Sequence, residues 1–235
     1  MIGGNSFVNK DCKKNNLYFG SPAKIVKNLN NWYSNKSMKK IKVIAEIGVN
    51  HNGKISLAKK LINFASLAKA DFVKFQIFKT DHLTIKNSKK AKYQSKNLNN
   101  DISQYKMLKN YELNDTQLNL LIKHCKKKKI EFLASCFDVD SVKRYLRYKP
   151  KYIKIPSGEI TNHQLLEFIG SKKKKIILST GMSKMQEVKK AIDLIIKSGT
   201  KRKNITVLQC TSDYPAKLKD TNLNCIKSYK EILKT

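Results

Sequence analysis

Three charged residues, Glu46, Lys74 and Lys154, have apolar neighbours on both sides in segments that are typical of buried β-strands. Because an unpaired buried charge costs several kcal/mol, each needs a buried partner or a polar cavity. A carboxylate in such a cavity can transfer protons. Two lysines can bind a substrate with two anionic groups, at about 1.5–3 kcal/mol per charge-assisted bond. The alternatives are an ion pair of either lysine with Glu46 or Glu159, and a Schiff-base role for Lys154.

Polar side chains also follow the ends of the segments that read as strands. In parallel α/β proteins ligands bind outside the carboxyl ends of the strands, so we expect these side chains to share one pocket. His51 is expected either to orient its turn or to contact the ligand, and His82, His124 and His163 are not expected to bind metal. The expected pocket members are Glu46, Lys74, Gln76, Ser135, Lys154, Ser157, Glu159, Ser179, Thr211 and Tyr214.

From residue 42 onward, short apolar segments alternate with longer amphipathic ones, a pattern typical of βαβ units. Strands are expected at 43–48, 72–78, 130–135, 152–156, 175–179 and 205–210. Helices are expected at 57–69, 116–128, 139–148, 164–169, 184–198 and 222–233. Such units fit an open doubly wound sheet or most of an eight-unit barrel, and without a G-x-G-x-x-G segment a dinucleotide fold is disfavoured. The segment 80–111 is expected to be a long functional loop.

The composition indicates a globular protein, because 40% of its 235 residues are hydrophobic. The net charge of +32 would suit nucleic acid or an anionic membrane, but only three of the 49 basic residues are arginines. Since arginine is favoured for gripping phosphate, we expect neither partner. No apolar run could span a membrane and no signal-peptide core is present, so a cytoplasmic location is expected. The five scattered cysteines, Cys136 and Cys210 among them, are expected to be reduced packing residues.

Residues 1–41 do not follow this alternation. A short β-type run at 17–19, followed by GSPAKIV at 20–26, resembles the closing segment of a left-handed β-helix sugar acyltransferase. A solenoid needs several stacked coils, and the first histidine is His51, so we expect a tail or fused segment without activity. The expected domains are therefore 1–41 and 42–235.

Five motifs resemble those of the sialic acid (nonulosonate) synthase family, with its N-acetylneuraminate and N,N'-diacetyllegionaminate synthase branches. They are AEIGVNHNG at 45–53, VKFQ at 73–76, KIPSGEITN at 154–162, LSTGM at 178–182 and CTSDYP at 210–215. The resemblance implies a TIM barrel that condenses phosphoenolpyruvate with an N-acylated mannose-type sugar and releases phosphate. It also implies a homodimer.

The resemblance implies a role for each residue that matches a motif. In the implied reaction the enol carbon attacks a metal-polarised open-chain aldehyde, water adds to the oxocarbenium, and phosphate leaves with C–O cleavage, so Lys154 would act electrostatically. Glu46 would be the acid/base carboxylate, and Glu159 would support the site. Phosphoenolpyruvate would be held by Lys74, Ser135, Lys154, Ser157 and Ser179, and the sugar by Gln76, Phe137, Ser212 and Tyr214.

The last two units of the family's barrel, with its two metal-binding histidines, have no match up to Thr235. The fold is therefore expected to be an incomplete (β/α)8 TIM-type barrel of six βα units with a short N-terminal extension. The divalent metal that the resemblance implies, Mn or Mg, is expected to find no ligands in this chain, and activity alone is expected to be weak. The alternatives are a noncatalytic or split-enzyme fragment, a basic nucleic-acid binder and a Schiff-base aldolase that uses Lys154.

Overall fold

The structure is a computed structural model in which the chain divides into two compact units. It describes residues 16–19, 24–28, 41–86 and 103–233. One unit comprises 1–41 with 213–221, and the other comprises 42–212 with 222–235. In the first unit, β1 (Asn16–Phe19) and β2 (Lys24–Asn28) pair antiparallel, and η3 (Leu218–Asp220) is a short 3-10 helix. Residues 20–23 lie outside the described residues, so the acyltransferase resemblance and the domain assignment stay predictions.

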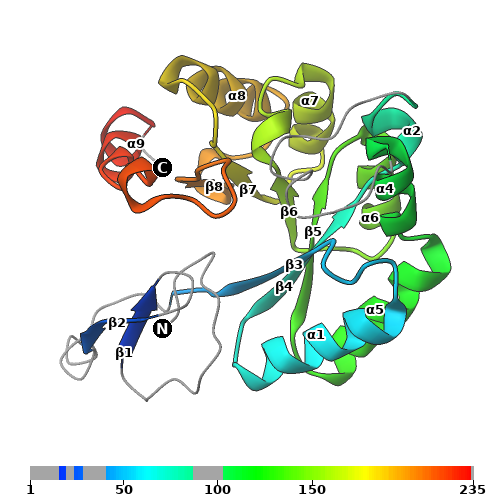
Figure 1. Ribbon diagram of the computed structural model, residues 1–235. Coiled ribbons are helices and arrows are strands. Elements are labelled where there is room, and N and C mark those ends of the chain that lie inside the picture. The colour runs from blue at the N-terminus through cyan, green and yellow to red at the C-terminus, as the bar shows by residue number, and fades with distance from the viewer. Residues whose placement is uncertain (1–15, 20–23, 29–40, 87–102, 234–235) are drawn as a thin grey trace. The chain divides into compact units, whose positions relative to one another are not determined.

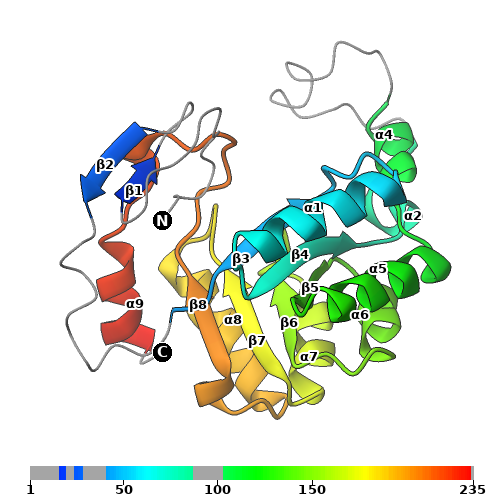
Figure 2. The same cartoon turned by 90° about the horizontal axis from the view of Figure 1, so that it is seen from below.

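The larger unit is built on a parallel sheet of six strands that follow one another in chain order. They are β3 (Ile44–Gly48), β4 (Phe72–Ile77), β5 (Glu131–Cys136), β6 (Tyr152–Ile155), β7 (Lys175–Ser179) and β8 (Ile205–Leu208). Figures 1 and 2 show the sheet curling around, with the helices on its outer side. The expected fold, an incomplete TIM-type α/β barrel, is confirmed.

Three of the helices on the outer side begin where the sequence supplies a capping side chain. Asn114 and Gln117 form a capping box, and Asp138 and Asn162 each accept a backbone N–H at the start of the next helix. The helices that follow the strands are α1 (Ile55–Leu67), α5 (Asp115–Lys127), α6 (Val139–Leu146), α7 (His163–Ser171), α8 (Met185–Lys197) and α9 (Cys225–Leu233). None of the helices within the described ranges is long and apolar enough to cross a membrane.

The connection between β4 and α5 differs from the long loop that we expected. It contains α2 (Thr80–Leu83) and α4 (Gln104–Tyr111). Glu112 accepts hydrogen bonds from the backbone N–H and the hydroxyl of Thr80, at 3.1 and 2.9 Å. These contacts join α2 to the end of α4, so helix formation there depends on polar tertiary ties that a hydrophobic pattern does not reveal.

The two faces of the six-stranded sheet are buried in different ways. The outer face packs against the helices in one large hydrophobic core, in which Val73, Ala134 and Ile153 are buried. The inner face holds a smaller apolar cluster with one residue from each strand. Its members are Ile44, Phe72, Leu133, Tyr152, Ile177 and Leu208. This inner cluster closes the space beneath the residues that carry the polar groups.

Candidate active site

A layer of polar side chains lies directly beyond the inner apolar cluster. Because side chains alternate along a strand, the residue two positions further on faces the same side of the sheet. In each of the six strands, the residue two positions after the inner apolar residue carries a polar group. The layer comprises Glu46, Lys74, Ser135, Lys154, Ser179 and Cys210.

Lys74 joins three strands through its ammonium group. It forms an ion pair with Glu46, its register partner on β3, and donates a hydrogen bond to Ser135 Oγ on β5 at 3.2 Å. Only 14% of the Lys74 side chain is exposed, against 50% for Glu46. The internal ion pair that we weighed as an alternative is therefore formed, and Glu46 keeps an open side toward solvent.

Lys154 is the buried cation of the layer, with 4% of its surface exposed. Its ammonium donates to Ser179 Oγ at 2.6 Å and to the carbonyl of Ile155 at 2.7 Å, and Cys210 Sγ lies 3.2 Å from the same Ser179 oxygen. Burial, and then repulsion from Lys74, lower the pKa of Lys154 to about 7. Near neutral pH Lys154 is therefore only partly protonated, and an anion beside it would raise its pKa.

Ser157 and Ser212 approach each other across Gly181. Ser157 is the first residue of the 3-10 helix η1 (Ser157–Glu159), and its Oγ accepts the Gly181 N–H at 2.9 Å. A Cβ on Gly181 would collide with Ser212 Oγ and come within 3.0 Å of Ser157 Oγ. The glycine therefore lets two hydroxyls and a peptide N–H gather at the end of β7.

The remaining predicted site residues are placed less uniformly. A Cβ on Gly48, whose φ is +54°, would lie 2.9 Å from Glu46 Oε1 and 3.7 Å from Gln76 Nε2, so glycine leaves room beside both side chains.

Phe137 packs edge-on against Phe78, with ring centroids 6.1 Å apart. Glu159 makes no ion pair with either lysine and instead accepts a hydrogen bond from Asn162 Nδ2 at 2.8 Å. Tyr214 belongs to the other unit, so its place beside the sugar stays a prediction.

Cys210 joins the polar layer although the sequence suggested only packing for it. Its role could have been found by extending the two-residue period of the β8 segment by one step beyond Leu208. Gly48 and Gly181 are two further site residues that the sequence did not indicate. Their signal is positional, because each follows or ends a strand whose polar residue faces the site.

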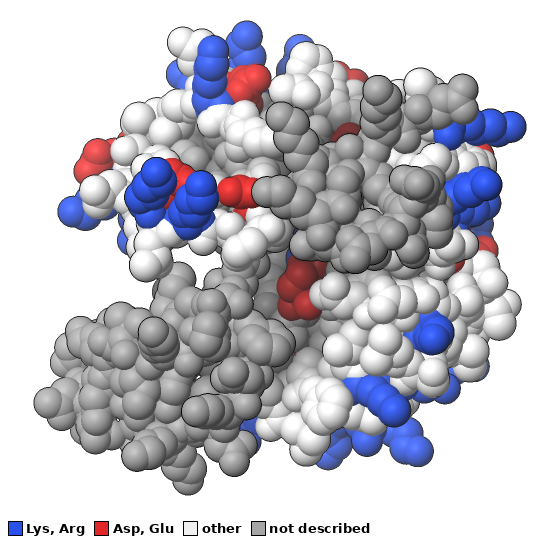
Figure 3. All heavy atoms as spheres, in the orientation of Figure 1, with Lys and Arg blue, Asp and Glu red and all other residues white. Residues whose placement is uncertain are grey.

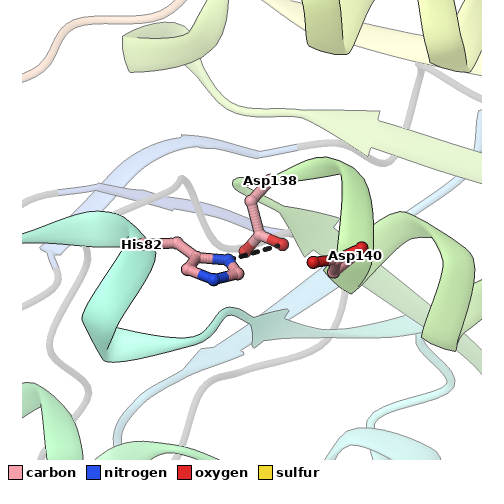
Figure 4. Close-up of side chains that lie close together, drawn as sticks. All are labelled: His82, Asp138 and Asp140. Atoms are coloured by element: carbon pink, nitrogen blue, oxygen red, sulfur yellow. Dashed lines mark ion pairs between the residues drawn. The ribbon is translucent and has the colours of Figure 1, made fainter.

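His82, Asp138 and Asp140 form a cluster of potential metal ligands that the sequence did not indicate (Figure 4). His82 Nδ1 lies 3.6 Å from Asp138 Oδ1. Both oxygens of Asp138 already accept hydrogen bonds from Ser141, where they cap α6, and Asp140 pairs with Lys143 at 3.2 Å. The cluster thus fits a helix cap with surface ion pairs better than a metal centre, and we assign no metal ligand among the described residues.

A hollow of about 330 Å³ lies between β8 and α9, apart from the polar layer. Its cationic lining residues are Arg202, Lys203 and Lys230, and the 3-10 helix η2 (Arg202–Asn204) contributes two of them. The rest of the lining combines the apolar side chains of Ile205, Val207 and Ile226 with Thr206 and Tyr229. Its three cationic side chains make this hollow a competing place for an anion.

His51 is completely buried on the outer side of the sheet, next to Phe75. Its Nδ1 accepts the N–H of Gly53 at 3.1 Å, which places the proton of the neutral ring on Nε2. This Nε2 has no hydrogen-bond partner within the described residues. Burial lowers the pKa of His51, so protonating it in the folded state is unfavourable. Of the two expected roles, the structure favours orientation of the turn.

Acid is expected to destabilise the protein through His51. The unfolded chain binds a proton on this ring near its ordinary pKa of about 6.5, whereas the folded chain binds it only at lower pH. The free energy of unfolding should therefore fall as the pH drops below about 6.5. Urea unfolding at pH 7.5, 6.5 and 5.5 should show a smaller fall for His51→Asn than for the parent. Exposed His163→Gln is the control, and an unchanged slope in His51→Asn would contradict this account.

The fold and the polar layer together define a class of protein. A curled parallel α/β sheet carries two ammonium groups, one carboxylate and several hydroxyls at the carboxyl ends of its strands. This is the arrangement of a barrel enzyme that binds an anionic substrate.

Comparison with known proteins identifies the family. The profile described as "NeuB family" matches residues 61–235, and the chain belongs to this family. It is 48% identical over 197 residues to the N,N'-diacetyllegionaminic acid synthase of Campylobacter jejuni, covering 84% of this chain and 59% of the relative. It is 43% identical to the enzyme of the same name from Legionella pneumophila, covering 79% of this chain and 53% of the relative.

A solved structure agrees with these sequence relatives. The N-acetylneuraminic acid (sialic acid) synthetase of Leptospira borgpetersenii, in complex with citrate, superposes with a TM-score of 0.70 at 29% identity. The match covers 83% of this chain and 62% of that chain. The chain thus spans a little over half the length of the relatives it matches, and the activity of the whole protein is a matter of proposal.

Proposed function

We propose that the larger unit binds phosphoenolpyruvate and belongs to an enzyme that condenses it with an N-acylated mannose-type sugar, giving a nonulosonic (legionaminic or sialic) acid and phosphate. The observation that carries this proposal is the pair of ammonium groups in the polar layer. Lys74 and Lys154 repel each other, and the single carboxylate of Glu46 compensates only one of them. An empty site with surplus positive charge is stabilised by a ligand with more than one anionic group.

Phosphoenolpyruvate has the right chemistry for this layer. Its phosphate and carboxylate can each accept charge-assisted hydrogen bonds from a lysine, and the phosphate can accept further bonds from hydroxyls. Ser135 and Ser179 already contact the two ammonium groups, so a ligand that reaches either lysine also reaches a hydroxyl. Ser157 supplies another hydroxyl at the neighbouring turn.

The proposed mechanism gives each residue one task. Lys74 and Lys154 hold the anion and stabilise charge on the phosphate as it leaves. The methylene carbon of phosphoenolpyruvate attacks the aldehyde carbon of the open-chain sugar, water adds to the neighbouring carbon that bears the phosphate, and the C–O bond from that carbon to phosphate breaks. Glu46, half exposed and next to Lys74, would take the proton from the attacking water. The sugar would lie beside Gln76, Phe137, Ser212 and Tyr214.

The family resemblance implies a divalent metal, Mn or Mg, which would polarise the sugar aldehyde. None of the proposed steps involves this metal, because none of the described residues is assigned as its ligand. Glu159 would act only indirectly, since it bonds Asn162, the residue that caps α7. The homodimer and the cytoplasmic location stay predictions. Figure 3 shows basic side chains at several places on the visible face, with acidic ones among them. That nucleic acid is not a partner stays a prediction.

Calorimetric titration tests the proposal on the chain itself. We expect phosphoenolpyruvate to bind at least about tenfold more tightly than inorganic phosphate or pyruvate, because each of these offers only one of the two anionic groups. Lys74→Met should weaken phosphoenolpyruvate binding about 10- to 100-fold. Lys189→Met, an exposed lysine on α8, should bind like the parent. No saturable binding of phosphoenolpyruvate, or equal affinity for phosphate alone, would overturn the proposal.

A Schiff-base enzyme is the second candidate function, and one observation favours it. A buried lysine with a pKa of about 7 supplies the neutral amine that attacks a ketone, forming an imine and releasing water. Incubation with pyruvate and borohydride would then fix the three-carbon unit on Lys154 as a secondary amine, seen as a mass increase in the peptide that contains it. Recovery of that peptide unmodified would exclude this candidate.

A further inference from the structure

A hydrogen-bond cluster outside the polar layer joins α9 to the ends of β7 and β8. The hydroxyl of Tyr229 lies 2.9 Å from Thr180 Oγ1 and 3.1 Å from Gln209 Oε1, and it directs its single proton toward these two oxygens. Thr180 Oγ1 donates to the carbonyl of Leu208 at 2.9 Å. Tyr229 is 7% exposed and Thr180 is 3% exposed. A single phenol thus contacts the residues that follow both strands, although it lies 49 residues from Thr180 in the chain.

This cluster is one peptide bond away from the proposed ligand site. Thr180 follows Ser179, whose hydroxyl accepts the hydrogen bond from Lys154 and lies beside Cys210. Leu208, which receives the Thr180 bond, is the register partner of Ser179 on β8. The position of the Ser179 hydroxyl is therefore held from one side by Lys154 and from the other by the anchorage of Thr180.

We infer that Tyr229 is a positioning residue for phosphoenolpyruvate binding, acting through Thr180 on Ser179; this inference rests on the proposed function. In this proposal Tyr229 acts on the ligand only through Thr180 and Ser179. Its hydroxyl restrains the backbone at Thr180, so that Ser179 is in place before the ligand arrives. When the groups of a site are already in place, binding does not have to order them, and the ligand binds more tightly.

Removing the phenolic oxygen tests the inference without removing the ring. Tyr229→Phe should raise the Kd for phosphoenolpyruvate about three- to tenfold, the change expected for losing one buried positioning hydrogen bond. Thr180→Val should raise it at least as much. The double variant should be no worse than Thr180→Val, because both changes break the same chain of contacts. Titrations are run well below the unfolding temperature, so that every variant is fully folded.

Tyr145→Phe is the matched control. Tyr145 is also a buried helical tyrosine, 2% exposed, whose hydroxyl donates to a strand carbonyl, that of Phe132, at 3.1 Å. It should lower the unfolding temperature and leave the Kd unchanged. The inference is overturned if Tyr229→Phe binds like the parent, or if Tyr145→Phe weakens binding equally. If the parent binds no phosphoenolpyruvate, the proposed function fails first and this inference fails with it.

Discussion

Replacing Lys154 by methionine is expected to make the protein more stable and to abolish its binding of phosphoenolpyruvate. Lys154 is 4% exposed, and the hydrogen-bond partners of its ammonium group are neutral oxygens of Ser179 and Ile155. Methionine fills a similar volume without a charge to desolvate. We expect the free energy of unfolding to rise by about 1–3 kcal/mol near pH 7, and the affinity for phosphoenolpyruvate to fall about a hundredfold.

The stabilisation expected for Lys154→Met depends on the pH. The pKa of Lys154 is lowered to about 7 in the folded chain, from 10.5. Between these values the unfolded chain holds a proton that the folded chain lacks, so the parent gains stability as the pH rises through this window. The advantage of Lys154→Met should therefore be largest at or below pH 7 and shrink toward pH 10.

A lysine directly before the same strand provides the control for this substitution. Lys151 directly precedes β6 and is exposed. Lys151→Met removes the same charge but should change neither stability nor affinity appreciably. Chemical unfolding and calorimetric titration of both variants give the comparison. A Lys154→Met protein that is less stable than its parent, or that still binds phosphoenolpyruvate, would show that Lys154 is not a cation that binds the ligand at a cost in stability.

Phosphoenolpyruvate affinity is expected to fall steeply as the pH rises above 7. Binding requires the charged form of Lys154, whose pKa in the empty site is about 7. Above that value the ligand must recruit a proton, so the Kd should rise by up to about tenfold per pH unit between pH 7 and 9. The ligand's own phosphate, whose second pKa is about 6, does not change charge in this range.

Proton uptake can be measured directly. Titrations in two buffers with different ionisation enthalpies should show about half a proton taken up per ligand at pH 7 and nearly one at pH 9. Lys154→Arg keeps its charge throughout this range and should flatten the pH dependence if it binds at all. A Kd that does not change from pH 7 to 9 in the parent would show that Lys154 does not hold the anion.

The strands of the larger unit could be predicted almost completely from the sequence. Apolar runs such as the one around Lys154 must be buried on both faces, and this requirement fixes them as strands of a parallel sheet. The helix α5 could be predicted as well, because Asn114 begins it with a capping side chain. By contrast, α4 has only one buried residue, Met107, and composition alone makes it look like a loop.

The candidate site could be predicted in part. Glu46 and Lys74 stand out because charge is rare in such segments, and the structure pairs them. The pairing of Lys154 with Ser179 depends on the register of β6 with β7, which no local pattern encodes. The contact of Tyr229 with Thr180 joins residues far apart in the chain, and only the packing of α9 creates it.

A crystal structure of the chain with phosphoenolpyruvate would show whether the polar layer at the carboxyl ends of β3 to β8 is the phosphoenolpyruvate site. We expect the ligand's anionic groups to lie within hydrogen-bond distance of the ammonium groups of Lys74 and Lys154, with Ser179 in contact. Phosphoenolpyruvate bound instead in the hollow lined by Arg202, Lys203 and Lys230 would contradict this expectation.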